Sequence, residues 1–304
     1  MISIIIPTRG DRPKPLVRLL ESIYQSDYKD FEVLIINDGG PLIEQSIHSY
    51  SGLTIFSNKK QRGLAFSRSR GTELAKGHYL LFIDDDNVIA KNMIDLLINT
   101  LDTYSQIAAI GPHTYYYTDK QKQWFLGVKV NLATSRHKFF SIPIQERLLT
   151  PQLFITDNLH NCFMVRKEIG KQLNWFDEKV FLAGTELDLI QKIKIAHPDA
   201  LCVTHLEAKC WHDVPLLSGH NLRSLGFENG TRVYYFQRNR GLITGRYGTY
   251  LDKLILFFIF YPFFVLAYSS LFIFHRHWEF LYAHLKGTLA GYFYLIKNFH
   301  KKQK

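Results

Sequence analysis

The stretch Leu80-Leu81-Phe82-Ile83-Asp84-Asp85-Asp86-Asn87 places three consecutive carboxylates directly after four apolar residues. The apolar run predicts a buried strand, and the acidic run marks its carboxyl end. Neighbouring carboxylates repel one another, so a cation or hydrogen-bond donors must offset their burial. Ligands bind at this end of the strands in open α/β sheets, and Mg²⁺ or Mn²⁺ with a phosphate-bearing substrate suits the position. The alternative is a solvated acidic turn before a helix that starts at Ala90.

The composition favours a globular chain with one large domain and an appendage. The chain has 304 residues, of which 46% are hydrophobic and 21% charged, enough to bury a core. The start, Met1–Pro7, has neither a basic region nor a long apolar run, so we expect a strand and not a signal peptide. Three cysteines without C-x-x-C spacing, Cys162, Cys202 and Cys210, favour a reducing cytoplasm over a disulfide scaffold or a thiolate zinc site.

Apolar periodicity alternates between strand and helix over the first 111 residues. It predicts strands at 2–7, 31–36, 53–57, 79–83 and 107–111, and helices at 12–26, 41–50, 64–76 and 90–103. This alternation predicts a parallel, doubly wound sheet with right-handed crossovers.

Beyond residue 112 the period is lost. Here we expect antiparallel strands near 115–117 and 124–130, a polar, mobile loop at 131–150, a strand at 161–166, a helix at 185–197, and short strands at 201–203 and 208–211.

The C-terminal part is basic and apolar. Residues 219–304 hold 12 Lys and Arg against three acids, a net of +9 out of +10 for the chain, which favours anionic lipid over nucleic acid as a partner. Residues 254–274 carry no charge and reach the ~20 residues that a membrane span needs, and Pro262 is tolerated there. Glu279, His284 and Lys286 make 278–296 a better amphipathic helix in the headgroup plane. The sequence leaves open whether 254–274 spans the membrane or lies half-embedded in it.

An ordered set of motifs resembles the family 2 inverting glycosyltransferases with the GT-A fold, over about residues 1–240. The motifs are Ser3-Ile-Ile-Ile-Pro-Thr8, Ile36-Asn-Asp-Gly39, Gly63-Leu-Ala-Phe-Ser-Arg68-Ser-Arg-Gly71, Phe82-Ile-Asp-Asp-Asp86, Trp175-Phe-Asp177 and Gly184-Thr-Glu-Leu-Asp188-Leu. No single motif is specific, but their order and spacing together are.

The resemblance implies an α/β, Rossmann-like mixed sheet of the nucleotide-diphospho-sugar transferase kind. A catalytic domain would cover 1–225, with a nucleotide-sugar half at 1–111 and an acceptor half at 112–225, and a membrane-associated helical tail would cover 226–304. The implied activity is metal-dependent transfer from a UDP-, GDP- or dTDP-sugar, with Mn²⁺ or Mg²⁺. The acceptor would be a hydroxyl of a polyprenyl-linked or polysaccharide molecule, at the cytoplasmic face of the cell membrane, in polysaccharide or glycolipid biosynthesis.

The resemblance assigns the nucleotide pocket to residues near the first strands. Asp38 would accept a hydrogen bond from the base, with Thr8 in the same pocket, although an Asx turn at Asp38 is compatible with this role. Asn37 stands where the family usually shows a second carboxylate. Arg68 would approach the pyrophosphate, the alternative being a surface charge, and Arg70 is expected at the surface.

Asp84 and Asp86 match the D-x-D pair of the family. Asp86 would bind the metal that bridges both phosphates, and Asp84 would contact the ribose or metal-bound water. Asp85 fills the variable position among the nucleotide-binding residues, and its role is open. His212 lies where many relatives place a histidine that completes the metal site, but a packed or surface histidine explains it equally well. His205 is a less favoured candidate.

Glu186 matches the general base of the family, which more often has Asp there. It would deprotonate an acceptor hydroxyl that attacks the anomeric carbon opposite the leaving diphosphate. Thr185 and Asp188 are spaced like a capping box, which gives Asp188 a structural role at the helix start. Asn161 and Asp188 are also candidates for the acceptor side.

Two further segments have expected roles, and two alternative functions compete with transfer. Trp175 and Phe176 are expected to pack in the core, and Tyr234–Asn239 resembles an interfacial helix with snorkelling arginines. A haloacid-dehalogenase-like phosphohydrolase would use Asp84 as nucleophile and Asp86 as acid/base, but it leaves Asp38 and residues 184–188 unexplained. A non-catalytic membrane scaffold is the second alternative, and the intact carboxylates argue against it.

Overall fold

The computed structural model describes residues 1–41, 43, 47, 50–144, 146–216 and 227–299. The chain forms two compact units. The first contains residues 1–129, 139–181 and 185–216, and the second contains residues 130–138, 182–184 and 217–304. The predicted helix at 41–50 lies mostly outside the described residues. The boundary expected after residue 225 lies in the stretch 217–226, which is likewise outside them.

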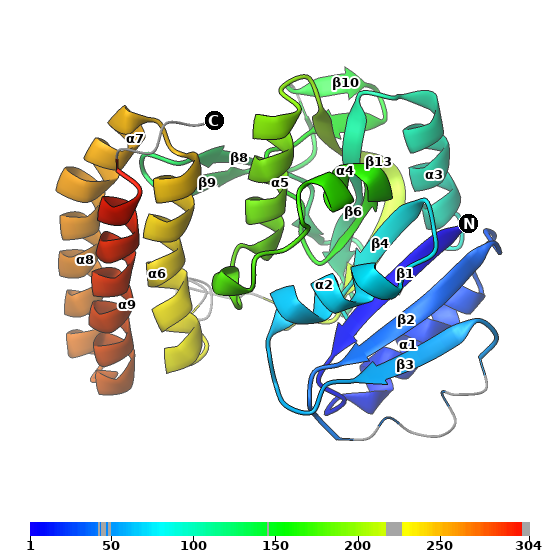
Figure 1. The fold of residues 1–304 in the computed structure, drawn as a ribbon, viewed down its shortest axis with the longest axis horizontal. Coiled ribbons are helices and arrows are strands. Elements are labelled where there is room, and N and C mark those ends of the chain that lie inside the picture. Colours follow the sequence, from blue (N-terminus) through cyan, green and yellow to red (C-terminus); the bar gives the residue numbers. More distant parts are fainter. Residues whose placement is uncertain (42, 44–46, 48–49, 145, 217–226, 300–304) are drawn as a thin grey trace. The chain divides into compact units, whose positions relative to one another are not determined.

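The N-terminal half of the first unit is the parallel sheet that the periodicity predicts. Strands β3, β2, β1 and β4 lie side by side in that order and run parallel (Figure 1). Their carboxyl ends therefore meet at one edge. The bounds are β1 (Ile2–Thr8), β2 (Phe31–Asn37), β3 (Leu53–Ser57) and β4 (Tyr79–Ile83), with α1 (Pro13–Tyr24), α2 (Leu64–Leu74) and α3 (Met93–Thr103) between or after them.

The other half adds antiparallel pairing, so the mixed sheet implied by the resemblance is confirmed. β12 (Cys162–Arg166) lies between β4 and β6 (Ile107–Tyr116) and runs antiparallel to both. β13 (Leu201–His212) runs parallel to β6 as one strand, with a register shift between His205 and Lys209 where two strands were expected. The strand itself was expected at 161–166, but a local pattern does not say which strands it pairs with.

The smaller strands occupy the segment predicted to be irregular. Residues 131–150 are not simply a loop, because they contain β9 (Arg136–Phe139) and β10 (Leu148–Thr150). Every residue of β9 is exposed, so no alternation of apolar and polar residues could reveal it. The remaining strands are β5 (Asn87–Ile89), β7 (Gln123–Phe125), β8 (Val128–Asn131) and β11 (Leu153–Ile155).

The core lies on both faces of the sheet. Residues of α1 and α3 pack on one face with Leu81 and Ile83, and residues of α2 and α5 (Thr185–Ala196) pack on the other with Leu80 and Phe82, as the alternation of side chains along a strand requires. The Phe82 ring contacts the rings of Phe163, Trp175 and Phe176 at centroid distances of 5.1, 5.6 and 5.0 Å. The expected packing of Trp175 and Phe176 is confirmed, and it holds rigid the strand that carries the carboxylates.

The second unit consists mainly of helices, with α6, α8 and α9 side by side (Figure 1). A continuous helical stretch, Tyr250–Phe274, is long and apolar enough to cross a membrane, and only 17% of its 18-residue apolar window is buried. Its parts are α7 (Tyr250–Ile255), a π-helical turn (Leu256–Phe260) and α8 (Tyr261–Phe274), and α6 (Gly230–Tyr247) and α9 (Trp278–Lys297) flank it in the chain.

Two arginines of α6, Arg238 and Arg240, are buried instead of snorkelling as expected. Arg238 and Arg240 are each less than 10% exposed, and the Arg240 guanidinium lies 3.8 Å from the ring centroid of Phe264. Aromatic faces offset the charge of a buried cation. On α9, His284 is fully buried whereas Leu289 is 72% exposed.

Candidate active site

The three carboxylates follow β4 in a tight turn that a neighbouring loop holds in place. The Asp84 backbone N–H donates to the Asn161 carbonyl over 2.9 Å, and Asn161 Nδ2 donates to Asn87 Oδ1 over 2.6 Å. Asn161 is 5% exposed. The structure therefore places Asn161, a candidate for the acceptor side, as a buried support of the acidic turn.

Arg12, which the sequence analysis missed, pairs with two of these carboxylates. Its Nη2 lies 2.5 Å from Asp85 Oδ1 and its Nη1 lies 2.9 Å from Asp86 Oδ2. Thr8 Oγ1 donates to the other Asp85 oxygen over 2.5 Å. Asp85, whose role was open, is thus the residue through which Thr8 and Arg12 are tied to the turn. The sequence feature that could have identified Arg12 is its position shortly after β1, near the predicted pocket residue Thr8.

Asp86 also faces His212, at the end of β13. His212 Nε2 lies 3.2 Å from Asp86 Oδ1, and the His212 and Trp124 rings meet edge to face at 4.4 Å. Burial favours the neutral form of Asp86, but His212 and Arg12 outweigh it and lower its pKa. The two residues expected to bind the metal, Asp86 and His212, therefore lie next to each other in the structure.

The Asp86 and His212 pair fits a divalent cation. Adjacent ligands of an octahedral shell with bonds of about 2.1 Å lie about 3 Å apart, which agrees with the 3.2 Å between Asp86 Oδ1 and His212 Nε2. Within the described residues no group of three or more His, Cys, Asp or Glu side chains gathers for a metal. The remaining ligands would therefore come from donor phosphates and water, which such cations commonly keep.

A second constellation surrounds Arg68, which is 0% exposed. Arg68 Nη1 donates to Glu186 Oε1 over 2.7 Å and to Thr185 Oγ1 over 3.1 Å, and its Nη2 donates to Asp84 Oδ1 over 2.9 Å. The surface alternative for Arg68 is therefore wrong, whereas Arg70 is 46% exposed and pairs with Glu73. The motif at 184–188 and the acidic turn, about 100 residues apart in sequence, meet at one guanidinium.

The two carboxylates on Arg68 have opposite pKa shifts. Burial raises the pKa of Asp84 to about 6, and the negative charges of Asp86 and Glu186 add to this effect while Arg68 opposes it. Burial also favours neutral Glu186, but the positive charge of Arg68 and the influence of His160 outweigh it and lower the pKa of Glu186. At neutral pH the Glu186 carboxylate is therefore ionised, with its side chain 12% exposed.

Asp38 holds the loop before α2 together. Its carboxylate accepts hydrogen bonds from Asn58 Nδ2 at 3.0 Å, from the Arg62 backbone N–H at 2.9 Å and from the Gly63 backbone N–H at 2.8 Å. These three hydrogen bonds fix the orientation of the Asp38 carboxylate. Gly63 has φ +92°, a conformation that favours glycine.

Asp188 lies in the first turn of α5. The helix begins at Thr185, whose hydroxyl donates to Glu186 Oε2 over 2.9 Å. Asp188 is fully buried and lies 3.3 Å from Lys192 Nζ, which also donates to the Trp175 carbonyl over 2.8 Å. Lys192 thus links Asp188 to the Trp175 carbonyl and ties α5 to the core.

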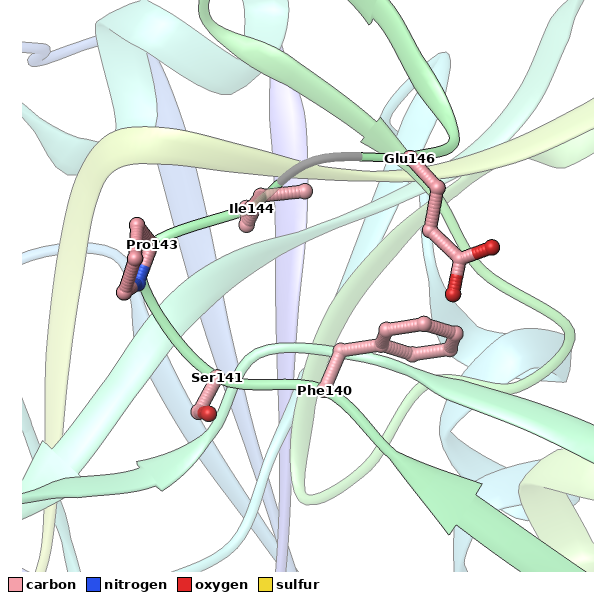
Figure 2. Close-up of a pocket in the computed structure, with 5 residues that line it drawn as sticks. All are labelled: Phe140, Ser141, Pro143, Ile144 and Glu146. Atoms are coloured by element: carbon pink, nitrogen blue, oxygen red, sulfur yellow. The ribbon is translucent and has the colours of Figure 1, made fainter.

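A pocket of about 420 Å³ lies in the segment between β9 and β10. Figure 2 shows its lining, with the Glu146 side chain directed toward the Phe140 ring. The lining residues are Phe140, Ser141, Pro143, Ile144 and Glu146. None of the candidate site residues belongs to it, so this pocket is not the candidate active site.

Two curated proteins are similar in sequence to part of this chain. An uncharacterized glycosyltransferase of Haemophilus influenzae is 33% identical over 105 residues, which cover 34% of this chain and 35% of that protein. A glucosyl-dolichyl phosphate glucuronosyltransferase of Haloferax volcanii is 24% identical over 115 residues, which cover 36% and 37%. The chain thus matches about a third of the length of each relative.

Solved structures share the fold. GalNAc-T7 with UDP, GalNAc and Mn²⁺ matches with a TM-score of 0.64 and 15% identity, over 83% of this chain and 49% of that one. Staphylococcus aureus TarS 1–349 with UDP-GlcNAc gives 0.59 and 13%, over 98% and 89%. The Pyrobaculum calidifontis mannosyltransferase PcManGT with GDP-Man and Mn²⁺ gives 0.56 and 13%, over 96% and 87%.

The family assignment rests on a longer match. Residues 3–173, more than half of the chain, match the family described as Glycosyl transferase family 2. This stretch contains β1 to β4, Arg68 and all three carboxylates of the acidic turn. The chain therefore belongs to glycosyl transferase family 2.

Proposed function

We propose that this chain is a metal-dependent inverting glycosyltransferase that moves a sugar from a nucleotide-diphospho-sugar to a hydroxyl of a lipid-linked or polysaccharide acceptor. The observation that carries the proposal is the joining of Asp84 and Glu186, from two distant motifs, on the buried guanidinium of Arg68. The nucleotide sugars in the solved TarS and PcManGT structures support the choice of donor. Family membership leaves the phosphohydrolase alternative without support.

Asp86 and His212 would hold Mn²⁺ or Mg²⁺, since their spacing suits two adjacent ligand positions. Such an ion stabilises the negative charge that develops on the leaving diphosphate. Arg12, whose side chain is half exposed beside Asp85 and Asp86, fixes both carboxylates and adds positive charge where phosphates would lie. Thr8 and Asp38 complete the donor side.

Glu186 would act as the general base. It is ionised at neutral pH, and the structure leaves a part of its side chain accessible. The acceptor hydroxyl gives its proton to Glu186 while its oxygen bonds to the anomeric carbon, and the bond from that carbon to the diphosphate oxygen breaks with its electron pair. Attack from the face opposite the diphosphate inverts the configuration.

The second unit supports a place at the membrane. The helical stretch Tyr250–Phe274 is mostly unburied, and large apolar side chains are exposed on it and on α9, including Leu266 at 70% and Leu289 at 72%. Exposed apolar surface of this extent suits lipid contact. We propose that a catalytic domain at 1–225 is followed in sequence by a membrane-associated tail at 226–304, and that the protein acts at the cytoplasmic face of the membrane.

The base assignment is tested with Glu186→Gln, and Glu73→Gln, an exposed residue of α2, serves as the matched control. In detergent-solubilised full-length protein, Glu186→Gln should still bind the donor, since Gln keeps the size of the side chain. It should lose transfer by about 10²-fold or more, the typical contribution of a positioned base. Transfer near the wild-type rate in Glu186→Gln would contradict the assignment.

A further inference from the structure

Arg68 contacts two carboxylates, more than are needed to neutralise one buried cation. A fully buried cation is costly unless it is paired and hydrogen-bonded, but one carboxylate would neutralise it. Arg68 instead contacts Asp84 Oδ1 at 2.9 Å and Glu186 Oε1 at 2.7 Å. The second carboxylate therefore calls for an explanation other than neutralisation.

From this geometry we infer that Arg68 is a positioning residue that joins the donor-side carboxylate Asp84 to the base Glu186, and this role rests on the function proposed above. It aims Glu186 and keeps it ionised. The predicted contact of Arg68 with the pyrophosphate is replaced by this role, because both Nη atoms are used inside the protein and the side chain is 0% exposed.

The bonds at Glu186 leave room for an acceptor hydroxyl. Oε1 accepts from Arg68 Nη1 at 2.7 Å, and Oε2 accepts from Thr185 Oγ1 at 2.9 Å. A carboxylate has about four acceptor sites, so both oxygens are oriented while capacity remains for the hydroxyl whose proton Glu186 takes. Two fixed partners hold the carboxylate in one orientation, which is what a general base needs.

The planar fork of arginine is needed for this task. Nη1 and Nη2 point to different carboxylates, and a lysine ammonium is a point charge that lacks the fixed fork. The charged groups that face Glu186 are Arg68 from α2, Asp84 from the acidic turn and His160 from the loop before β12. Loss of the Arg68 charge removes the largest influence that opposes burial and the negative charge of Asp84, and it raises the pKa of Glu186.

The test compares Arg68→Gln and Arg68→Lys with Arg70→Gln, an exposed arginine on the same helix, in the detergent-solubilised full chain. The titration of Glu186 is followed by ¹³C NMR of labelled glutamate carboxyls, assigned by comparison with Glu186→Gln. A second readout is the release of nucleoside diphosphate from UDP-, GDP- and dTDP-sugars with Mn²⁺ as a function of pH.

In Arg68→Gln the Glu186 midpoint should rise by about 1–3 pH units, the range for loss of an adjacent opposite charge. The acid side of the pH–rate profile should shift to higher pH by a similar amount. Arg68→Lys should fall between this variant and wild type, and Arg70→Gln should match wild type. A slower Arg68→Gln enzyme whose midpoint and profile are unmoved would show that Arg68 only stabilises the fold, and would overturn the inference.

Where Arg68→Gln does not fold, Thr185→Val removes the other partner of Glu186 with little change in volume. It should raise the midpoint by a smaller amount, because a neutral hydrogen bond is lost and not a charge, and an unchanged midpoint would count against the inference. A wild-type titration that shows the pairing, with no turnover of any nucleotide sugar, would support the inference about Arg68 and count against the proposed function.

Discussion

Replacement of Asp84 by Asn should change how stability depends on pH. Burial is the main reason that the pKa of folded Asp84 is about 6, against an ordinary value of 3.8. The folded protein therefore binds this proton more tightly than the unfolded chain does, so the free energy of unfolding falls as the pH rises from about 4 to about 6. The asparagine side chain of Asp84→Asn does not titrate, so the free energy of unfolding of this variant should lack this pH-dependent decrease.

The size follows from the shift. A difference of about two pKa units corresponds to about 3 kcal/mol, and this is an upper bound because the Asp84 side chain is 29% exposed and water stabilises part of its charge. The stability of wild type relative to Asp84→Asn should thus fall by up to about 3 kcal/mol between pH 4 and pH 7. Other titrating groups contribute to both proteins and cancel in the difference.

Urea unfolding of the metal-free, detergent-solubilised protein measures this difference, with tryptophan fluorescence as the signal. Trp175 is a suitable reporter because its ring lies 5.6 Å from the Phe82 ring of β4. Asp199→Asn, at an exposed position, is the control and should follow wild type at every pH. A difference between wild type and Asp84→Asn that stays flat from pH 4 to pH 7 would refute the reasoning.

Two further predictions concern contacts that the sequence did not reveal. Arg12→Met should lower the free energy of unfolding by about 1–3 kcal/mol, measured by urea unfolding. It leaves Asp85 and Asp86, which are 4% and 10% exposed, without their shared cation. Gly241→Ala should cost about 1–3 kcal/mol of helix packing, measured by thermal unfolding, because the added Cβ would lie 2.0 Å from the Gly291 carbonyl oxygen.

Control substitutions at matched positions distinguish these losses of stability from nonspecific effects of substitution. Arg9→Met changes an arginine that is 65% exposed, and it should be nearly neutral. Gly245→Ala lies on the same helix as Gly241 but meets its nearest atom only at 3.2 Å, so it should cost less. Equal losses in each variant and its control would contradict the packing described for Arg12 and Gly241.

The sequence predicted well those elements whose signal is local. The strand at 79–83, the strand at 53–57 and the helix from Leu64 were expected within a few residues, because buried strands and amphipathic helices have a clear apolar period. β12 between β4 and β6 could not be predicted in this way. Its place depends on pairing between residues about 80 positions apart, and periodicity holds no information on partners.

The same distinction applies to the site. Position after a strand identified Asp84, Asp85 and Asp86, and the resemblance identified Glu186. The burial of Arg68 could not be predicted, because a helical arginine with neighbours of mixed polarity usually lies at the surface. A cation is buried here only because two carboxylates from remote segments converge on it.

The most direct test of the central claim is donor binding by the detergent-solubilised protein. UDP-, GDP- and dTDP-sugars are screened by thermal shift with and without Mn²⁺, in wild type, in Asp86→Ala and in the control Asp199→Asn. A ligand at 100 times its Kd stabilises the folded state by about 2.7 kcal/mol. We expect a Mn²⁺-dependent shift with one nucleotide class, retained in Asp199→Asn and lost in Asp86→Ala. No shift with any nucleotide sugar in folded wild-type protein, or an equal shift in Asp86→Ala, would contradict it.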